Sequence, residues 1–115
     1  MTFRKLSVLL AFLLCSFYSQ AQQSATYTND LVEYQKALAL YNSKQYQAAQ
    51  SLFETLKNEA ESETIESDCA YYIANCAVRL NQKNADDLIQ DFVDAYPTSI
   101  KRNTALSHQI GRAHV

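Results

Sequence analysis

Apolar side chains recur along this chain with the period of an amphipathic α-helix. Four stripes follow it, most neighbours in a stripe being three or four residues apart. They consist of Leu31, Tyr34, Leu38 and Tyr41; Tyr46, Ala49, Phe53 and Leu56; Ile65, Cys69, Tyr72, Ile73, Cys76 and Leu80; and Ala85, Leu88, Ile89, Phe92, Val93 and Tyr96. The stripes predict helices over residues 30–43, 46–60, 65–81 and 85–96. The third helix is apolar nearly all round, so it should be the central one.

Polar segments set the expected ends of these helices. Residues 42–45 and 81–84 predict tight turns, and Pro97 should end the fourth helix because the residue before a proline avoids helical geometry. Candidate N-caps are Asp30 for the first helix, with Glu33 as its capping-box partner, Thr64 or Ser67 for the third, and Thr98 or Ser99 for a fifth helix over residues 99–108.

The second stripe resembles the tetratricopeptide repeat family. Tyr46, Ala49 and Phe53 match the family's aromatic, small and aromatic positions, and Ala85 with the closing Tyr96–Pro97 matches the pattern again 36 residues later. The family period is ~34 residues. The resemblance implies an all-α fold in which helix-turn-helix repeats stack as an α-solenoid, with about two and a half units over residues 30–109. Ala37 and Asn75 stand where the family usually has glycine, so the repeat type stays open.

The first residues have the pattern of a secretory signal peptide. Arg4 and Lys5 precede an apolar run at residues 6–18, and Ser19 and Ala21 are small residues suited to cleavage after Ala21. An uncleaved membrane anchor is the alternative, but the run is shorter than the roughly 20 residues that span a bilayer. We therefore expect a signal peptide at residues 1–21, a disordered lead-in at residues 22–29, and no membrane span after cleavage.

The last six residues, 110–115, match the translation of a common sequencing adapter. This match predicts that the native reading frame stops near Gln109 and that the natural chain continues beyond it. A short disordered tail is the alternative.

Charge and composition exclude several functions. Residues 22–109 hold seven basic and twelve acidic residues, a net charge of −5, with no basic cluster, which argues against nucleic-acid binding. The only glycine is Gly111, so glycine-rich phosphate-binding loops are excluded and no cofactor is expected. No nucleophile has an evident base, so we expect no enzymatic activity.

Cys69 and Cys76 are the cysteines of the expected mature region. Two helical turns would separate them by roughly 10 Å, beyond the reach of a disulfide. They are therefore interpreted as small buried side chains, with pairing to a cysteine beyond residue 109 as the alternative. His108 lacks the spacing to these cysteines that a zinc site needs, and no metal is expected. The acidic segment from Glu59 to Asp68 lacks the glycine of a calcium loop.

A polar stripe on the third helix is the candidate binding site. Asp68, Tyr72, Asn75 and Arg79 share one face of this otherwise apolar helix, and Tyr34, Tyr41 and Asn42 hold comparable places on the first helix. In stacked hairpins such first helices line a concave groove, and tyrosine and arginine are favoured interface residues. The predicted partner-binding residues are Tyr34, Tyr41, Asn42, Tyr72, Asn75 and Arg79. The alternative is a solvated edge.

These observations favour an exported scaffold without catalytic activity that binds a protein or peptide partner in its groove. The segment at residues 95–99 is similar to repeats of exported Gram-negative proteins of cell-envelope assembly. This similarity implies a periplasmic or outer-membrane-associated location. The alternatives are an accessory region of a larger envelope enzyme and a structural spacer.

Overall fold

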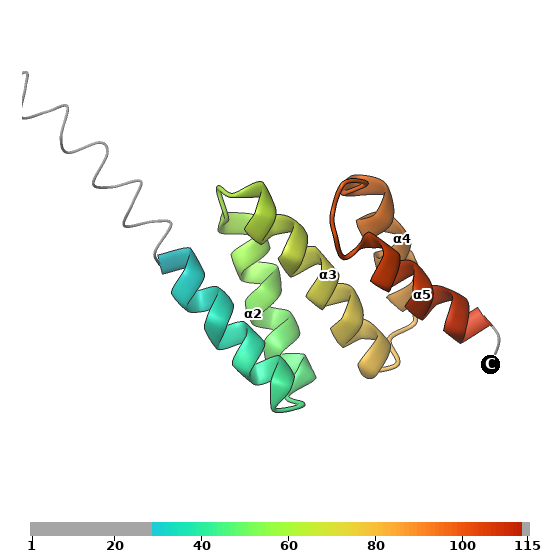
Figure 1. The fold of residues 1–115 in the computed structure, drawn as a ribbon. Coiled ribbons are helices and arrows are strands. Elements are labelled where there is room, and N and C mark those ends of the chain that lie inside the picture. Colours follow the sequence, from blue (N-terminus) through green and yellow to red (C-terminus); the bar gives the residue numbers. More distant parts are fainter. Residues whose placement is uncertain (1–28, 114–115) are drawn as a thin grey trace, which may run out of the picture.

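The described residues of the computed structural model, 29–113, form five helices joined by short connections and contain no strand. The first helix covers residues 29–42, and it is followed by α2 (Tyr46–Glu59), α3 (Glu63–Arg79), α4 (Ala85–Ala95) and α5 (Arg102–Ala113) (Figure 1). The all-α prediction is confirmed. The expected signal peptide, the lead-in up to residue 28 and the last two residues lie outside the described part.

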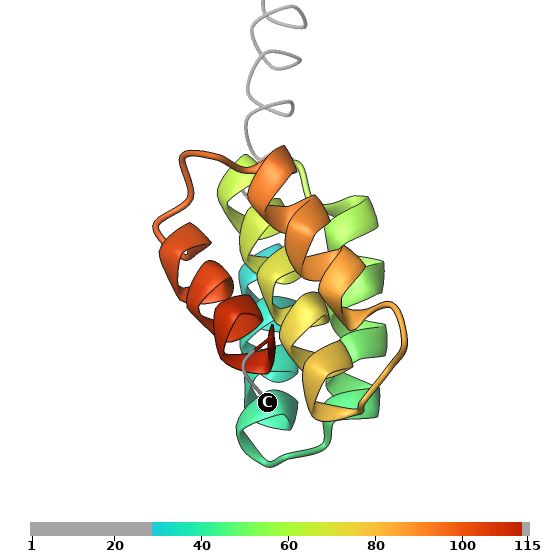
Figure 2. The same cartoon turned by 90° about the vertical axis from the view of Figure 1, so that its right-hand side faces the viewer.

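Consecutive helices pack against one another. α2 packs on α3, α3 on α4, and α4 on α5. Figure 2 shows the first helix and α5 towards one side of the molecule and α2 towards the other. The predicted central place of α3 is confirmed, because seven of its residues, from Ile65 to Ala77, are buried. No helix within residues 29–113 is long and apolar enough to span a membrane.

The predicted apolar stripes form two adjoining cores. The first core joins the first helix, α2 and α3 and contains Ala37, Ala49, Phe53, Leu56, Ile65, Cys69, Ile73 and Cys76. The second joins α3, α4 and α5 and contains Ala74, Ile89, Phe92, Val93 and Ala105. Ala49 and Ala85 are completely buried, so the two small positions lie where helices come close.

Several predicted helix ends were wrong. Asp30 lies inside the first helix, which already includes Asn29, so it is not an N-cap. α3 begins at Glu63, before both expected caps, and α5 begins at Arg102 and continues through Ala113. Residues 110–113 are therefore helical. Gln45, Ser62 and Asn84, which precede α2, α3 and α4, make no side-chain cap hydrogen bond. Packing decides where these helices begin, and capping side chains contribute less than expected.

Two turns share one backbone geometry. After the first helix, the Gln45 amide donates to the Leu40 carbonyl (2.9 Å) and the Lys44 amide to the Tyr41 carbonyl (3.0 Å). After α3, the Gln82 amide donates to the Ala77 carbonyl (2.9 Å) and the Asn81 amide to the Val78 carbonyl (3.2 Å). This is the Schellman motif, which usually has glycine at its left-handed residue. Here Lys44 (φ 64°) and Asn81 (φ 55°) hold that conformation. The first helix with α2 and α3 with α4 form two hairpins, and both hairpins have the same turn geometry without glycine.

A reciprocal pair of amides ties the two hairpins together. The Gln50 side chain on α2 donates to Gln82 Oε1 (3.0 Å), and the Gln82 side chain donates to Gln50 Oε1 (2.8 Å). Gln50 Nε2 also lies 3.3 Å from the carbonyl oxygen of Ile73. Gln50 is buried, so without these bonds its side-chain amide would have no hydrogen-bond partner, neither protein nor water.

The Gln50→Ala variant should lose about 1–3 kcal/mol of unfolding free energy, because the change removes three hydrogen bonds at a buried position. Urea denaturation of Gln50→Ala, Gln82→Ala and the double variant measures the coupling, which we expect to be about 1 kcal/mol. Gln90→Ala on the exposed side of α4 is the matched control. Additive effects of the two single variants would show that the two side chains do not stabilise each other.

Candidate functional site

The predicted site tyrosines meet in one aromatic cluster. The ring of Tyr72 on α3 lies edge-on to Tyr41 and to Tyr34 of the first helix, with ring centroids 5.0 and 6.5 Å apart. Tyr46 at the start of α2 packs edge-on against Tyr41 (5.4 Å). Three helices from two hairpins thus contribute to one half-buried surface. Aromatic pairs in such geometry contribute about 0.5–1.5 kcal/mol each beyond their burial.

Phe53 of α2 forms the floor of this cluster. It is fully buried, and its ring stacks on that of Tyr72 at 5.1 Å with 10° between the planes. Burial raises the pKa of Tyr34, Tyr41 and Tyr72, and Asp68 raises those of Tyr34 and Tyr72 further. The nearby Arg79 lowers the pKa of Tyr41 in part. The three hydroxyl groups therefore stay protonated at neutral pH and can donate hydrogen bonds.

Asp68 is the polar centre of the cluster. Its Oδ1 lies 3.3 Å from Lys101 Nζ, and its Oδ2 accepts a hydrogen bond from the Tyr34 hydroxyl at 3.3 Å. The same Lys101 ammonium lies over two rings, 4.6 Å from the centroid of Tyr72 and 5.3 Å from that of Tyr71. The residue just before α5 is thereby joined to the first helix and α3.

The structure separates the six predicted site residues into groups. Tyr34, Tyr41 and Tyr72 lie together, and Arg79 lies over the Tyr46 ring, 6.0 Å from its centroid. Asn75 is only 7% exposed, so its side chain adds little to any surface. Asn42 is exposed at the end of the first helix. The polar stripe expected on α3 is therefore divided, because the neighbouring helices cover Asn75 and leave Arg79 exposed.

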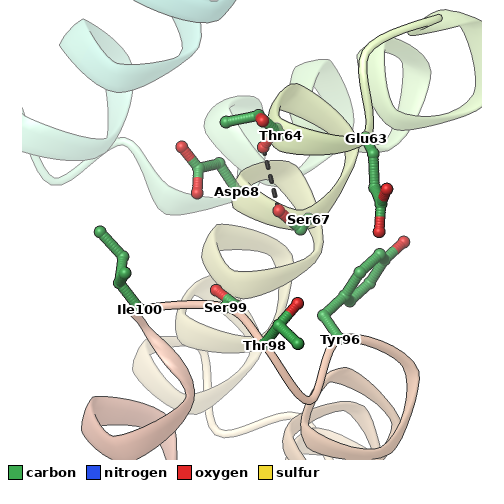
Figure 3. Close-up of a pocket in the computed structure, with 8 residues that line it drawn as sticks. All are labelled: Glu63, Thr64, Ser67, Asp68, Tyr96, Thr98, Ser99 and Ile100. Carbon is green, nitrogen blue, oxygen red and sulfur yellow. Dashed lines mark hydrogen bonds between the residues drawn. The ribbon is translucent and has the colours of Figure 1, made fainter.

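A hollow of about 380 Å³ opens beside Asp68. Figure 3 shows it between the N-terminal turns of α3 and the connection from α4 to α5. The lining residues are Glu63, Thr64, Ser67, Asp68, Tyr96, Thr98, Ser99 and Ile100. The hydroxyl of Tyr96 donates to Glu66 at 2.8 Å, which fixes the end of α4 against α3. Burial, and then its bond to Glu66, raises the pKa of Tyr96 to about 12. The hollow offers mainly hydroxyl and carboxylate groups.

Cys69 and Cys76, the cysteines within residues 29–113, lie in the core and are free thiols. Burial raises the pKa of Cys69 to about 12 and that of Cys76 to about 11, and neighbouring carboxylates add to both effects. Such thiols are poor nucleophiles and poor metal ligands. Within residues 29–113, no group of three or more histidine, cysteine, aspartate and glutamate side chains is placed to hold a metal ion. The side chain of His108 lies outside the described part.

Sequence reasoning missed Lys101 and the hollow. Lys101 lies 33 residues from Asp68 in the chain, on the connection before α5, and no periodic pattern relates the two. The signal that could have found it is the pair of adjacent basic residues, Lys101 and Arg102, directly after the exposed Ile100. Comparison of the chain with models of known families, with characterised proteins and with solved structures finds no significant match.

Proposed function

We propose that this protein is an exported scaffold of the tetratricopeptide type, without catalytic activity, that binds a protein partner on the face built by its first helix and α3. In this proposal its hairpins are two and a half units of an α-solenoid. The repeated turn geometry at Lys44 and Asn81 supports equivalent hairpins. The family assignment rests on the residues at Tyr46, Ala49, Phe53 and Ala85, and the envelope location rests on the expected signal peptide.

The observation that carries the proposal is the tyrosine cluster that spans two hairpins. Tyr34, Tyr41 and Tyr72 are half-buried, so each ring is held by its neighbours and still presents part of its surface. A tyrosine held in this way gives apolar contact area and a hydroxyl group at low cost in conformational entropy. Arg79 and Lys101 flank the cluster with charged groups. Aromatic anchors with a polar rim are typical of protein interfaces.

Photocrosslinking tests which face binds a partner. A benzophenone amino acid is introduced at Asn42 or Arg79, both exposed beside the cluster, and at Asn58 on α2 or Asp91 on α4 as matched exposed controls. The full chain is expressed with its own leader in a Gram-negative host and irradiated in cells. We expect a discrete adduct from the first pair of positions and none from the second.

The adduct should also depend on the cluster. Adding Tyr72→Leu to the Asn42 variant keeps an apolar side chain but removes the aromatic ring and hydroxyl, and it should abolish the adduct while the protein stays folded by circular dichroism. Equal adducts from both faces, or an adduct that survives Tyr72→Leu, would place the partner elsewhere and reject this function for the cluster.

A further inference from the structure

The ammonium group of Lys101 occupies a recess of defined chemistry. Two tyrosine rings face it at 4.6 and 5.3 Å, and the Asp68 carboxylate lies 3.3 Å from Nζ. Aromatic faces carry negative potential, and together with a carboxylate they form the surroundings that bind ammonium groups. Tyr34 holds Asp68 in place from the first helix. The three groups of the recess, Asp68, Tyr71 and Tyr72, all belong to α3, so their positions do not depend on Lys101.

The occupant reaches the recess from the connection before α5 and keeps part of its side chain exposed. Lys101 precedes α5, in a connection where Ile100 is 92% exposed. Its backbone amide donates to Ser99 Oγ at 3.2 Å, and its side chain keeps 23% of its surface exposed. Rotation about side-chain bonds could move the ammonium to solvent without moving either helix.

The hollow shares Asp68 with the recess, so a second ammonium in the hollow would meet the same carboxylate. Asp68 belongs both to its wall and to the pair with Lys101. Glu63, Thr64, Ser67 and Ser99 are among its other lining residues, and Figure 3 shows Asp68 and Ile100 on facing sides of it. These groups offer oxygen acceptors to an ammonium donor, whereas an anion would meet two carboxylates.

We propose that the recess of Asp68, Tyr71 and Tyr72 is a binding site for a lysine side chain of the partner, and that Lys101 fills it while no partner is bound. The partner's lysine enters through the hollow and displaces Lys101 to solvent. The net charge of −5 over residues 22–109 also favours a basic partner. The inference rests on the proposed function only in assigning the lysine to a protein partner. Binding of a lysine side chain to the recess can be tested without that partner.

The test measures binding of Nα-acetyl-lysine methylamide to the full chain by NMR of the Tyr71 and Tyr72 rings. Lys101→Ala should empty the recess and bind this probe about tenfold more tightly than the unchanged protein, because the internal competitor is gone. Lys83→Ala, at an exposed lysine in the turn before α4, is the matched control and should bind like the unchanged protein. Nα-acetyl-norleucine methylamide has the same stem without the ammonium and should not bind to any variant.

Two results would overturn the proposal. One is a folded Lys101→Ala protein that binds the lysine probe no more tightly than the Lys83→Ala control, and the other is equal binding of the norleucine probe. If Lys101→Ala does not fold, the test is an NMR titration of the unchanged protein with the lysine probe. Its Lys101 ε-methylene signals, shifted by the two rings, should move towards the position of free lysine as the lysine probe is added, and no movement would reject displacement. Crosslinking at Asn42 does not depend on these results, so the two proposals can fail separately.

Discussion

Replacing Phe53 with alanine should lower the free energy of unfolding by about 3–5 kcal/mol. Phe53 has no exposed surface, stacks on Tyr72 and meets Tyr34 edge-on at 6.1 Å. The substitution therefore leaves a cavity at the point where the first helix, α2 and α3 meet. Because domains of this size are stable by about 5–15 kcal/mol, this loss is a large part of the total stability and should clearly lower the melting temperature.

Thermal and urea unfolding followed by circular dichroism measure this loss. Thr55→Ala, on the exposed side of the same helix, is the matched control and should change the free energy of unfolding by less than about 0.5 kcal/mol. Phe53→Leu keeps part of the volume and should fall between the two. A Phe53→Ala protein that melts at the temperature of the unchanged protein would contradict the packing described for the first core.

Folding should protect Cys69 and Cys76 almost completely from thiol reagents. Both are fully buried, and the raised pKa values of about 12 and about 11, against an ordinary value of 9.0, reduce the reactive thiolate. Below pH 9 the thiolate fraction falls by about a thousandfold for Cys69 and about a hundredfold for Cys76 relative to the unfolded chain. Loss of access to the reagent slows the reaction further.

The measurement is the rate of reaction with an aromatic disulfide reagent at pH 8, with and without urea. A Cys15→Ser background removes the cysteine outside the described residues. Thr55→Cys on the surface of α2 supplies an accessible thiol as the control. Two slow thiols and one fast thiol are expected without urea, and three fast thiols with it. Rapid reaction of Cys69 or Cys76 in the folded protein would mean that α3 is not the central helix.

The helical architecture was predictable because its cause is local. The spacing of Tyr46, Ala49 and Phe53 identifies one face of α2 whatever the rest of the chain does, and the structure buries that face. The ends were less predictable. Asp30 and Thr64 have the residue types of caps, but helix packing extends the first helix and α3 past them. An N-cap contributes only about 1 kcal/mol, less than the burial of one large apolar side chain.

The candidate site was predictable only in part. Tyr34, Tyr41 and Tyr72 could be placed on comparable helix faces from their spacing, and they do meet. Asn75 could not be assigned, because its exposure depends on how closely the neighbouring helices approach α3. The solenoid arrangement, the partner and the expected export remain predictions, and the crosslinking experiment addresses the partner through the binding face.

The sequence by itself determined where the first four helices lie, which apolar face of each turns towards the core, and that Cys69 and Cys76 are too far apart to pair. These properties follow from a period of 3.6 residues and from helical rise, which act over neighbouring residues. Only the tertiary structure decided the pairs that join distant segments: Tyr34 with Asp68, Gln50 with Gln82, and Lys101 with Tyr71 and Tyr72. Their members lie about thirty residues apart in the chain, and contact between them depends on how the hairpins pack on one another.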